Sequence, residues 1–511
     1  MKNNNSIQSR KQTFKNIFFS YFSIFFTLVT GLLYTPWLIR ELGQSEYAIY
    51  SIVISLMSYV TVDFGLSAVV SRFIAKYLAA GEREKIKGFV GIVLKVYIII
   101  TTVAFVVLVA LFFMIENIYQ GLTAEEIEKL KVVYIIMAVM TVFSIPALPL
   151  NGIYTAHGRV YNNKIFDLIS KLLIIVFVCI SLLSGKGLYY VVLINALVTV
   201  SINIVKLLYI RKAEHLEIDV TYKDKAVVKN ILSFSAWMTI AMIADKFFFT
   251  IEPSLLAAFS NSREVAIFGV AAQIEGYVLL FAEALNGIFL PKVAVLANEE
   301  NANKKLTDLM ISVGKLQLFV VAGLVIAITT LGKEFISLLF GPEYVDSYYS
   351  VIIILCPCII HMTQGIGMEI LYVKNKVKYR ALSYTVGAII NVIVTVILVP
   401  SLGAIGAAIG IATGFLVGHE IIMNIIYSKA LNLGIGRFFK NCHLKMVLPM
   451  VISLIVGLIA AKALPDGSFL FLIIKGGICA VCYFASSFIF FIGKDERNQL
   501  LGFVKRKLLR K

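Results

Sequence analysis

The sequence predicts an all-α, polytopic membrane protein, and three observations support this prediction. The 511 residues are 59% hydrophobic with a mean hydropathy of +0.88, which excludes a soluble domain. About fourteen apolar stretches alternate with short polar breaks, and each stretch is long enough to cross a bilayer as a helix. Basic residues concentrate in every second break: the termini and the even-numbered breaks hold 35 of the 47 Lys and Arg, the odd-numbered breaks hold 7, and the helices hold 5.

The distribution of basic residues also predicts the orientation of the chain. Positive charge marks the cytoplasmic side of a membrane protein, so we expect both termini and all even-numbered breaks to be cytoplasmic. The same distribution explains the formal net charge of +17, which therefore does not indicate a nucleic-acid partner.

Each apolar stretch is predicted to be one transmembrane helix. The clearest of them begin near Phe18, Tyr47, Gly88, Val132, Ile165, Leu188, Ile231, Val265, Leu306, Tyr348, Leu382, Ala404, Met446 and Phe469. The first is not a cleavable signal peptide, because it is about 24 residues long and no small-x-small cleavage site follows it.

The longest polar stretch between helices runs from Arg211 to Lys229 and predicts a cytoplasmic linker between two six-helix lobes. The predicted parts are an N-terminal lobe (1–212), the linker (213–226), a C-terminal lobe (227–430), two further helices (431–495) and a basic amphipathic cytoplasmic tail (496–511). The alternation of leucine with lysine and arginine in that tail is typical of a helix on an anionic membrane surface.

Weak internal similarity supports the two lobes. The motif YAIY at 47–50 recurs as VAIF at 265–268. Downstream, basic residues recur at a constant offset of 220, namely Arg72 with Lys292, Lys85 with Lys305 and Lys95 with Lys315. Six helices is an even number, so the two repeats are parallel, and substrate is expected near the midplane between them.

Several charged residues lie inside the predicted helices, where each costs about 2.5–3.5 kcal/mol on insertion scales. Asp245 and Lys246 lie near the middle of helix seven and Glu275 near the middle of helix eight. Asp63 lies inward of the centre of helix two, and Lys95 and Lys315 are equivalents in the repeat. Adjacent residues on a helix point about 100° apart, so Asp245 and Lys246 need further partners or water. These residues are the candidates for a functional cavity.

Other polar residues within the helices are expected to be structural. Asp167 and Lys171 are four residues apart and are predicted to pair on one helix face. Lys475 is expected to extend toward the membrane surface. His361, His419 and Glu420 are expected to be satisfied by packing contacts.

Helix twelve carries glycine at every fourth position, at Gly406, Gly410, Gly414 and Gly418. This spacing produces a ridge without side chains and predicts close packing against another helix. A sliding surface during a conformational change is the alternative.

Two motif patches resemble the opening of polysaccharide flippases. They are TPWLIRELG at 35–43 followed by EYAIY at 46–50, and DFGL at 63–66 followed by SRF at 71–73. The segment ADK at 244–246 with VAIF at 265–268 resembles the start of the second lobe. The chain is thus similar to the Wzx-type exporters of O-antigen and capsule repeat units, which belong to the MOP superfamily together with MATE drug exporters and lipid II flippases.

This resemblance implies a MATE/MOP-like pair of lobes that rock between inward-open and outward-open states in a bacterial or archaeal plasma membrane. Helices one, two, seven and eight would line the cleft between them. The implied cargo is an oligosaccharide on undecaprenyl pyrophosphate, whose head is anionic. The candidates for contact with that head are Arg40, Arg72, Lys95, Lys246, Lys292 and Lys315, because basic side chains suit an anion in a low-dielectric cleft.

The sequence also indicates how transport is driven. There is no Walker A pattern, so ATP does not drive transport directly. The candidates for ion coupling are Asp63, Asp245 and Glu275. Neither a cofactor nor a metal site is expected. Membrane lipids and the polysaccharide polymerase machinery are the other expected partners.

Two alternatives remain. A MATE-like exporter of cationic small molecules would need an acidic cavity, whereas acids and bases are mixed here. A membrane polysaccharide polymerase or ligase would need a sizeable outer loop with catalytic groups, and the largest outer break covers only about Glu116 to Lys131. The leading prediction is therefore a flippase and not an enzyme.

Overall fold

The computed structural model describes residues 2–63, 65–225, 239–248, 250–283 and 289–491. All regular secondary structure in these ranges is helical. Nine of their helices are long and apolar enough to cross a membrane, or ten if the bent pair Ser347–Met362 and Gly365–Val373 forms one span. The predicted all-α membrane fold is confirmed, and the chain is a multi-pass membrane protein. The number of fourteen spans stays a prediction.

Two long helices are broken by glycine at places where the sequence predicts a turn between spans. Helix α1 (Lys2–Val60) leaves helical geometry at Gly43, with φ of 74°. Helix α15 (Val377–Gly414) does so at Gly403, with φ of 52°. Positive φ is accessible to glycine without strain. Each glycine therefore ends one predicted span and begins the next.

The chain divides into two compact units, Met1–Gly269 with Thr395–Ala407, and Val270–Val394 with Ala408–Lys511. Residues 239–269 thus group with the N-terminal half, although the predicted lobe boundary lies in the linker before them. The helices that lie within the first unit are α1, α2 (Leu66–Ala80), α3 (Arg83–Ile118), α4 (Ala124–Ser144), η1 (Ile145–Ala147), α5 (Leu150–Ala156), α6 (Val160–Leu183), α7 (Leu188–Glu214) and α9 (Glu252–Phe259).

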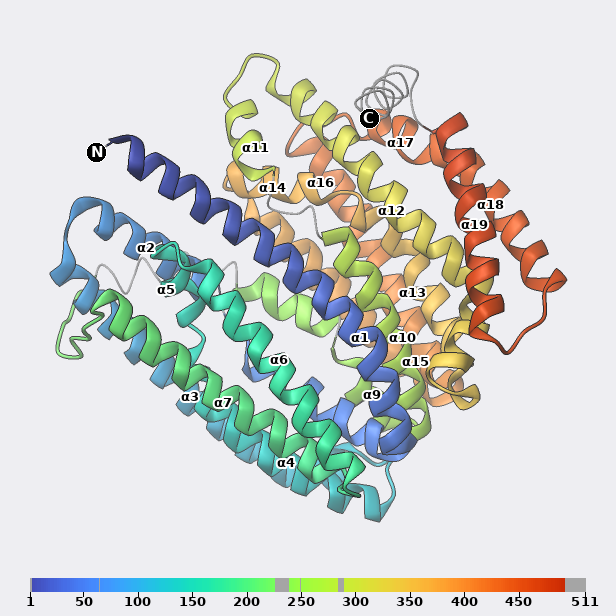
Figure 1. The fold of residues 1–511 in the computed structure, drawn as a ribbon, viewed down its shortest axis with the longest axis horizontal. Coiled ribbons are helices and arrows are strands. Elements are labelled where there is room, and N and C mark those ends of the chain that lie inside the picture. Colours follow the sequence, from blue (N-terminus) through green and yellow to red (C-terminus); the bar gives the residue numbers. More distant parts are fainter. Residues whose placement is uncertain (1, 64, 226–238, 249, 284–288, 492–511) are drawn as a thin grey trace. The chain divides into compact units, whose positions relative to one another are not determined.

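In the first unit, α3, α4, α6 and α7 run side by side (Figure 1). A hydrophobic core of this unit is formed by residues of α2, α3 and α5. Phe73 of α2 stacks on Phe89 of α3 with ring centroids 5.2 Å apart. Tyr97 and Tyr154, from α3 and α5, are fully buried beside them. Burial of each aromatic side chain contributes roughly 2–3 kcal/mol.

The remaining helices belong wholly or mostly to the second unit. They are α10 (Ser262–Glu283), α11 (Leu290–Leu296), α12 (Ala302–Leu339), η2 (Pro342–Tyr344), α13 (Ser347–Met362), α14 (Gly365–Val373), α15, η3 (Phe415–Ile422, a π-helix), α16 (Met423–Lys429), α17 (Ile435–Asn441), α18 (His443–Ala463) and α19 (Phe469–Phe490). The last two run antiparallel and pack on each other and on α12 (Figure 1).

The glycine ridge of the twelfth predicted helix packs closely, as expected. A Cβ atom added to Gly418 would lie 2.8 Å from the Cα atom of Gly387, and Ser383 Oγ donates a 2.6 Å hydrogen bond to the Gly418 carbonyl. A Cβ atom on Gly406 would lie 2.7 Å from the Leu398 backbone. These distances permit only glycine without displacement of the neighbouring helix.

Two expectations about charged residues in the helices are wrong. Asp167 does not pair with Lys171 but with Lys206 of α7, at 2.6 Å, while Lys171 Nζ donates to Thr27 Oγ1. Lys475 does not extend to the surface: its side chain is fully buried, with Nζ 2.7 Å from Glu334 Oε2. In both cases the charged side chain pairs with a residue on a neighbouring helix. A pair within one helix was expected for Asp167, and extension to the membrane surface was expected for Lys475.

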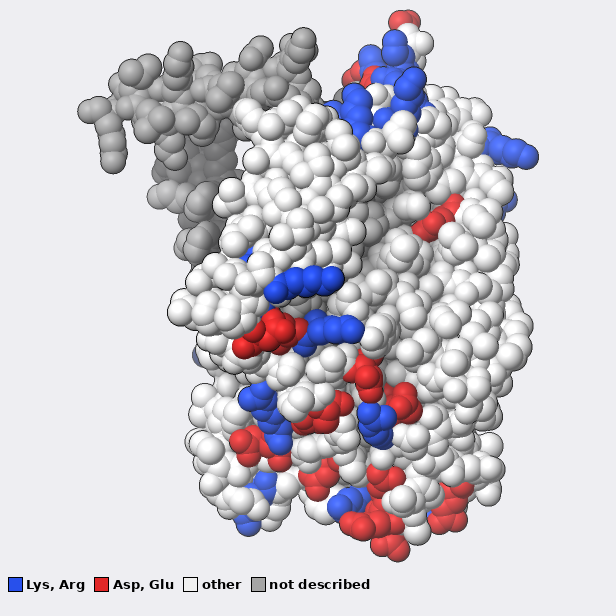
Figure 2. Space-filling model, turned by 90° about the vertical axis from the view of Figure 1, so that its right-hand side faces the viewer, with Lys and Arg blue, Asp and Glu red and all other residues white. Residues whose placement is uncertain are grey.

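Figure 2 shows a face on which most of the surface is uncharged, with Lys and Arg side chains gathered at the top of the view and acidic side chains mixed with further Lys and Arg in its lower half. An uncharged band of this kind is expected of a surface in contact with lipid. The predicted basic tail, 496–511, lies outside the described residues.

Candidate functional site

Asp63 lies in the bend between α1 and α2, and its carboxylate joins α2 to α3. Its two oxygens accept hydrogen bonds from Ser67 N (3.1 Å), Ser67 Oγ (2.7 Å) and Tyr97 OH (3.0 Å). Gly65, with φ of 68°, gives the chain the turn that brings Ser67 back toward the carboxylate. Three donors suit an ionised carboxylate, and this set stabilises the bend.

Lys95 lies half-buried on α3, where Nζ donates a 3.1 Å hydrogen bond to the carbonyl of Tyr222. Tyr222 belongs to the linker after α7, so this lysine holds the linker backbone against α3. The Asp219 amide also donates to the Lys87 carbonyl, at 3.2 Å. A Cβ atom on Gly91 would lie 1.8 Å from the Asp219 carbonyl oxygen. The start of the linker is therefore fixed to the first unit.

An exposed ion pair also contributes to this attachment. Glu217 of the linker lies 2.7 Å from Lys87 Nζ. The hydrogen bond and the positive charge of Lys87 lower the pKa of the Glu217 carboxyl group. The Glu217 side chain is exposed and the Lys87 side chain is partly exposed, so this pair contributes little to the attachment of the linker compared with the backbone contacts.

A polar seam connects the second predicted helix, in α1, to residues 250–254. Ser55 Oγ donates to the Thr250 carbonyl, and Ser58 Oγ donates to Thr250 Oγ1 at 3.2 Å. Tyr119 OH donates to Ser254 Oγ at 3.4 Å. This seam is not predicted from the sequence, because serine and threonine are common in transmembrane helices. Its only signal is their three- and four-residue spacing.

Asp245 and Lys246 lie one turn before the seam, on the helical stretch 239–248 of the first unit. Both side chains are half-buried. The Thr250 amide and hydroxyl group both bond to the Lys246 carbonyl, at 3.0 and 2.7 Å, which fixes the backbone of this stretch relative to the seam. The charged pair is thus held beside the second predicted helix, in one unit with Asp63.

The other predicted site residues are dispersed. Arg40 is exposed on α1 three residues before Gly43, Arg72 is exposed on α2, and Lys292 is exposed on α11. Glu275 is buried on α10, and Lys315 is half-buried on α12. Of these residues, Lys292, Glu275 and Lys315 belong to the second unit.

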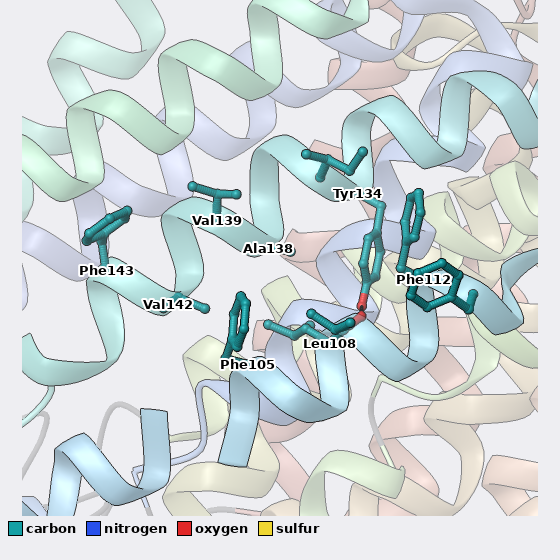
Figure 3. Close-up of a pocket in the computed structure, with 11 residues that line it drawn as sticks. Phe105, Leu108, Phe112, Tyr134, Ala138, Val139, Val142 and Phe143 are labelled. Atoms are coloured by element: carbon teal, nitrogen blue, oxygen red, sulfur yellow. Dashed lines mark hydrogen bonds between the residues drawn. The ribbon is translucent and has the colours of Figure 1, made fainter. Parts of the chain in front are cut away.

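A pocket of about 440 Å³ lies between α3 and α4, and apart from Tyr134 only hydrocarbon side chains line it (Figure 3). Phe105, Leu108 and Phe112 face it from α3, and Val139 and Phe143 face it from α4. No charged residue lines it. It suits an apolar chain and cannot hold an anionic head group.

A second cavity, of about 310 Å³ and mixed polarity, lies within the second unit. Polar side chains that line it are His361, Glu369, Tyr372, Arg380 and Tyr384. His361 makes ring contacts with Tyr384 and His419, as the expectation of packing contacts implied. Among the described residues, no group of three His, Cys, Asp or Glu side chains has a geometry that suits a metal ion.

The N-terminal part of the chain matches a known protein family. Residues 13–291 match the model of a family described as polysaccharide biosynthesis protein, which is more than half of the chain. The chain belongs to this family. The search of curated proteins found no match to this sequence.

Solved structures show the fold of this polysaccharide biosynthesis protein. The lipid II flippase MurJ, in an inward closed conformation, superposes with a TM-score of 0.73 at 16% identity, over 93% of this chain and 98% of the other. An inward-facing multidrug resistance transporter of the MATE family, from the MOP superfamily, gives 0.62 at 14%, over 82% and 96%. The bent form of the Vibrio cholerae MATE transporter VcmN gives 0.56 at 14%, over 83% and 97%. The predicted MOP-superfamily fold is confirmed.

Proposed function

We propose that the protein is a flippase that moves undecaprenyl-pyrophosphate-linked oligosaccharide repeat units from the inner to the outer leaflet. The observation that carries this proposal is membership of the polysaccharide biosynthesis family in a chain whose fold is that of the MOP superfamily. A family of polysaccharide synthesis needs its lipid-linked intermediates on the far side of the membrane, and a multi-pass transporter fold without a large outer domain suits that step.

Among the predicted anion contacts, we favour Lys246 as the contact with the pyrophosphate. It is half-buried in the first unit, in a position where a lysine without a function would be costly. Arg72 and Lys292 are exposed and are suited to the first encounter with the head group on the cytoplasmic side. Arg40 is at the outer end of its predicted span, and Lys315 is half-buried on α12. Lys95 is less suited, since it already bonds to the linker.

For ion coupling, Asp245 and Glu275 remain the candidates among the predicted acids. Glu275 is 7% exposed on α10, and Asp245 is half-buried. Asp63 is better suited to a structural role, because three donors already occupy its oxygens. The proposed transport is non-enzymatic, with both termini and the linker in the cytoplasm of a bacterial or archaeal cell.

A MATE-like exporter of small molecules is the second candidate, favoured by the likeness to MATE transporters. That likeness covers 82–83% of the chain, compared with 93% for MurJ. The family description names polysaccharide synthesis, which favours the flippase.

The proposal is tested in cells that lack the native gene and express variants at native level. Lys246→Ala should cause lipid-linked repeat units to accumulate on the inner leaflet and should decrease surface glycan, whereas Lys246→Arg should retain part of the activity. Lys186→Ala, which removes a lysine from an outer turn, is the matched control. Normal surface glycan in cells without the protein would overturn the function, while normal glycan with Lys246→Ala alone would overturn only the role of Lys246.

A further inference from the structure

The polar cavity of the second unit lies at a break in a predicted span. Helices α13 and α14 are bent by 47° relative to each other, and His361 and Gly365, on either side of the break, line the cavity. Gln364 at the break donates to Asn424 Oδ1 at 2.9 Å, which fixes the break against α16. Irregular backbone at membrane depth is tolerated where it lines a cavity, and discontinuous helices of this kind typically form the substrate sites of transporters.

The charged groups that line the cavity have opposite signs. Glu369 of α14 brings a carboxyl group, and Arg380 of α15 brings a guanidinium group. An anion beside Arg380 would be repelled by Glu369, and a cation beside Glu369 would be repelled by Arg380. The cavity therefore suits a neutral polar ligand better than a pyrophosphate or a cationic drug.

The same side chains can both donate and accept hydrogen bonds. A guanidinium group has several N–H donors and a carboxylate has several acceptor positions, so Arg380 and Glu369 can each bond to a ligand in addition to their protein partners. The imidazole of His361 and the hydroxyl group of Tyr372 extend this set. Hydroxyl groups of a ligand also donate and accept, so a polyhydroxyl compound matches the lining.

Tyr372 gives the cavity an aromatic surface. Its side chain is 38% exposed, and its hydroxyl group accepts a hydrogen bond from Arg380. Tyr384 is 2% exposed, with the Arg380 guanidinium 4.8 Å from its ring centroid and the His419 ring 3.9 Å away, so its faces are already covered. Tyr384 thus orients the guanidinium, while the ring of Tyr372 is available to pack against the C–H face of a sugar.

The position and size of the cavity suit a sugar of a lipid-linked glycan. Residues 374–380, which follow α14 and include Arg380, carry four basic residues and therefore lie at the predicted cytoplasmic end. The volume of about 310 Å³ is near the lower end of the range of small-molecule sites, roughly 300–1,000 Å³. The cavity thus suits a small part of a glycan rather than a whole repeat unit.

We propose that this cavity is a glycan subsite, in which the ring of Tyr372 packs on a sugar while Glu369, Arg380 and His361 bond to its hydroxyl groups. The subsite rests on the flippase function proposed above and adds recognition of the glycan to it. It is separate from the contact with the pyrophosphate that is proposed for Lys246. The sugar is bound without any covalent bond being made or broken.

The subsite is tested by binding of two lipids to the purified full chain in nanodiscs. One probe is the undecaprenyl-pyrophosphate-linked repeat unit of the native host, and the other is undecaprenyl pyrophosphate without sugar. The wild type should bind the first lipid roughly ten-fold more tightly, the factor expected of one hydrogen bond to a charged group. Equal affinities of the wild type for the two lipids would overturn the subsite.

Substitutions separate contact with the glycan from contact with the pyrophosphate. Tyr372→Leu should remove most of the ten-fold preference by weakening only the glycan-bearing lipid, whereas Tyr372→Phe should retain most of it. Lys246→Ala should weaken both lipids and keep the preference. Tyr349→Leu is the matched control, because Tyr349 also bonds to a basic side chain, Lys333 Nζ at 2.8 Å, but does not line the cavity. Equal weakening of both lipids by Tyr372→Leu would overturn the role of Tyr372.

A second measurement needs no lipid probe. Tyr372→Trp keeps an aromatic ring and places a fluorescent indole in the cavity of a chain that has two native tryptophans. Its emission should change in a saturable way with soluble disaccharides of glucose, galactose or N-acetylglucosamine, and Glu369→Gln in the same background should weaken this response. A response to inorganic pyrophosphate instead, or to none of the disaccharides, would overturn the subsite.

Flipping of the two lipids in proteoliposomes distinguishes failure of the subsite from failure of the proposed function. A wild type that prefers the glycan-bearing lipid in binding but flips neither lipid would contradict transport and leave the subsite standing. A wild type that binds and flips both lipids equally would contradict the subsite and leave transport standing.

Discussion

The carboxylate of Glu46 accepts a 3.2 Å hydrogen bond from the backbone amide of Leu188, the first residue of α7. The same relationship recurs in the second half of the sequence, where Glu264 Oε2 accepts from the Ala404 amide at 2.8 Å. Each glutamate immediately precedes the repeated motif, YAIY or VAIF, and each amide follows a glycine at a turn between two spans. The internal repeat therefore extends from sequence to hydrogen bonding.

These two glutamates satisfy amide groups at helix starts, so their loss should destabilise the protein. Glu46→Ala and Glu264→Ala should each lower the free energy of unfolding by about 1 kcal/mol, as for the loss of a helix cap. The Gln variants should retain most of this stability, since the side-chain amide oxygen also accepts a hydrogen bond from the backbone amide. Thermal unfolding in detergent measures this, with exposed Glu128→Ala as control. Equal stability of Glu46→Ala and the control would contradict the role.

The buried Lys475 should be the most sensitive charged residue of the last helix pair. Its Nζ lies 2.7 Å from Glu334 of α12 and 2.5 Å from Asp466, which joins α19 to α12 and to the turn between α18 and α19. Lys475→Met should cost about 2 kcal/mol by leaving Glu334 without its cation, and Glu334→Gln in the same chain should recover part of that loss. Additive losses in the double variant would show that the pair does not interact.

The attachment of the linker to α3 should depend on the absence of a side chain at residue 91. Gly91→Ala places a Cβ atom against the Asp219 carbonyl, so the linker must move away. Hydrogen exchange at residues 216–222 should become at least several-fold faster, and Lys95→Met should have a smaller effect in the same direction. Gly477→Ala, where no atom lies within 4 Å of the added Cβ, is the control. Unchanged exchange in Gly91→Ala would mean that the linker is not held there.

The basic residues predict the orientation of the chain, which labelling can test. In a background without native cysteines, Asn117→Cys should react with an impermeant maleimide on intact cells, and Lys223→Cys should react only after the membrane is opened. The opposite pattern would reverse the proposed orientation and place the linker outside.

The sequence was sufficient for the fold because the bilayer imposes long apolar helices, and glycine marks breaks such as Gly43 and Gly403. The sequence was insufficient to predict which polar side chains pair with each other. The spacing of Asp167 and Lys171 permits a pair, yet Lys206 on another helix bonds to Asp167 instead.

Lys475 likewise finds Glu334, 141 residues away. The cavity beside His361 required the same kind of long-range information, because its polar lining comes from three helices. Local patterns thus predicted the helices, whereas contacts between helices decided which polar residues come together.

Flipping by the purified protein tests the central claim most directly. Proteoliposomes with an undecaprenyl-pyrophosphate-linked glycan in both leaflets are compared with and without the protein, and glycan in the outer leaflet is measured by its accessibility to an impermeant glycosidase. The account predicts that all of the glycan becomes accessible with the wild type, about half without protein, and an intermediate or slower conversion with Lys246→Ala. If the wild type leaves about half of the glycan protected while its orientation and folding are intact, the protein is not a flippase for this class of lipid.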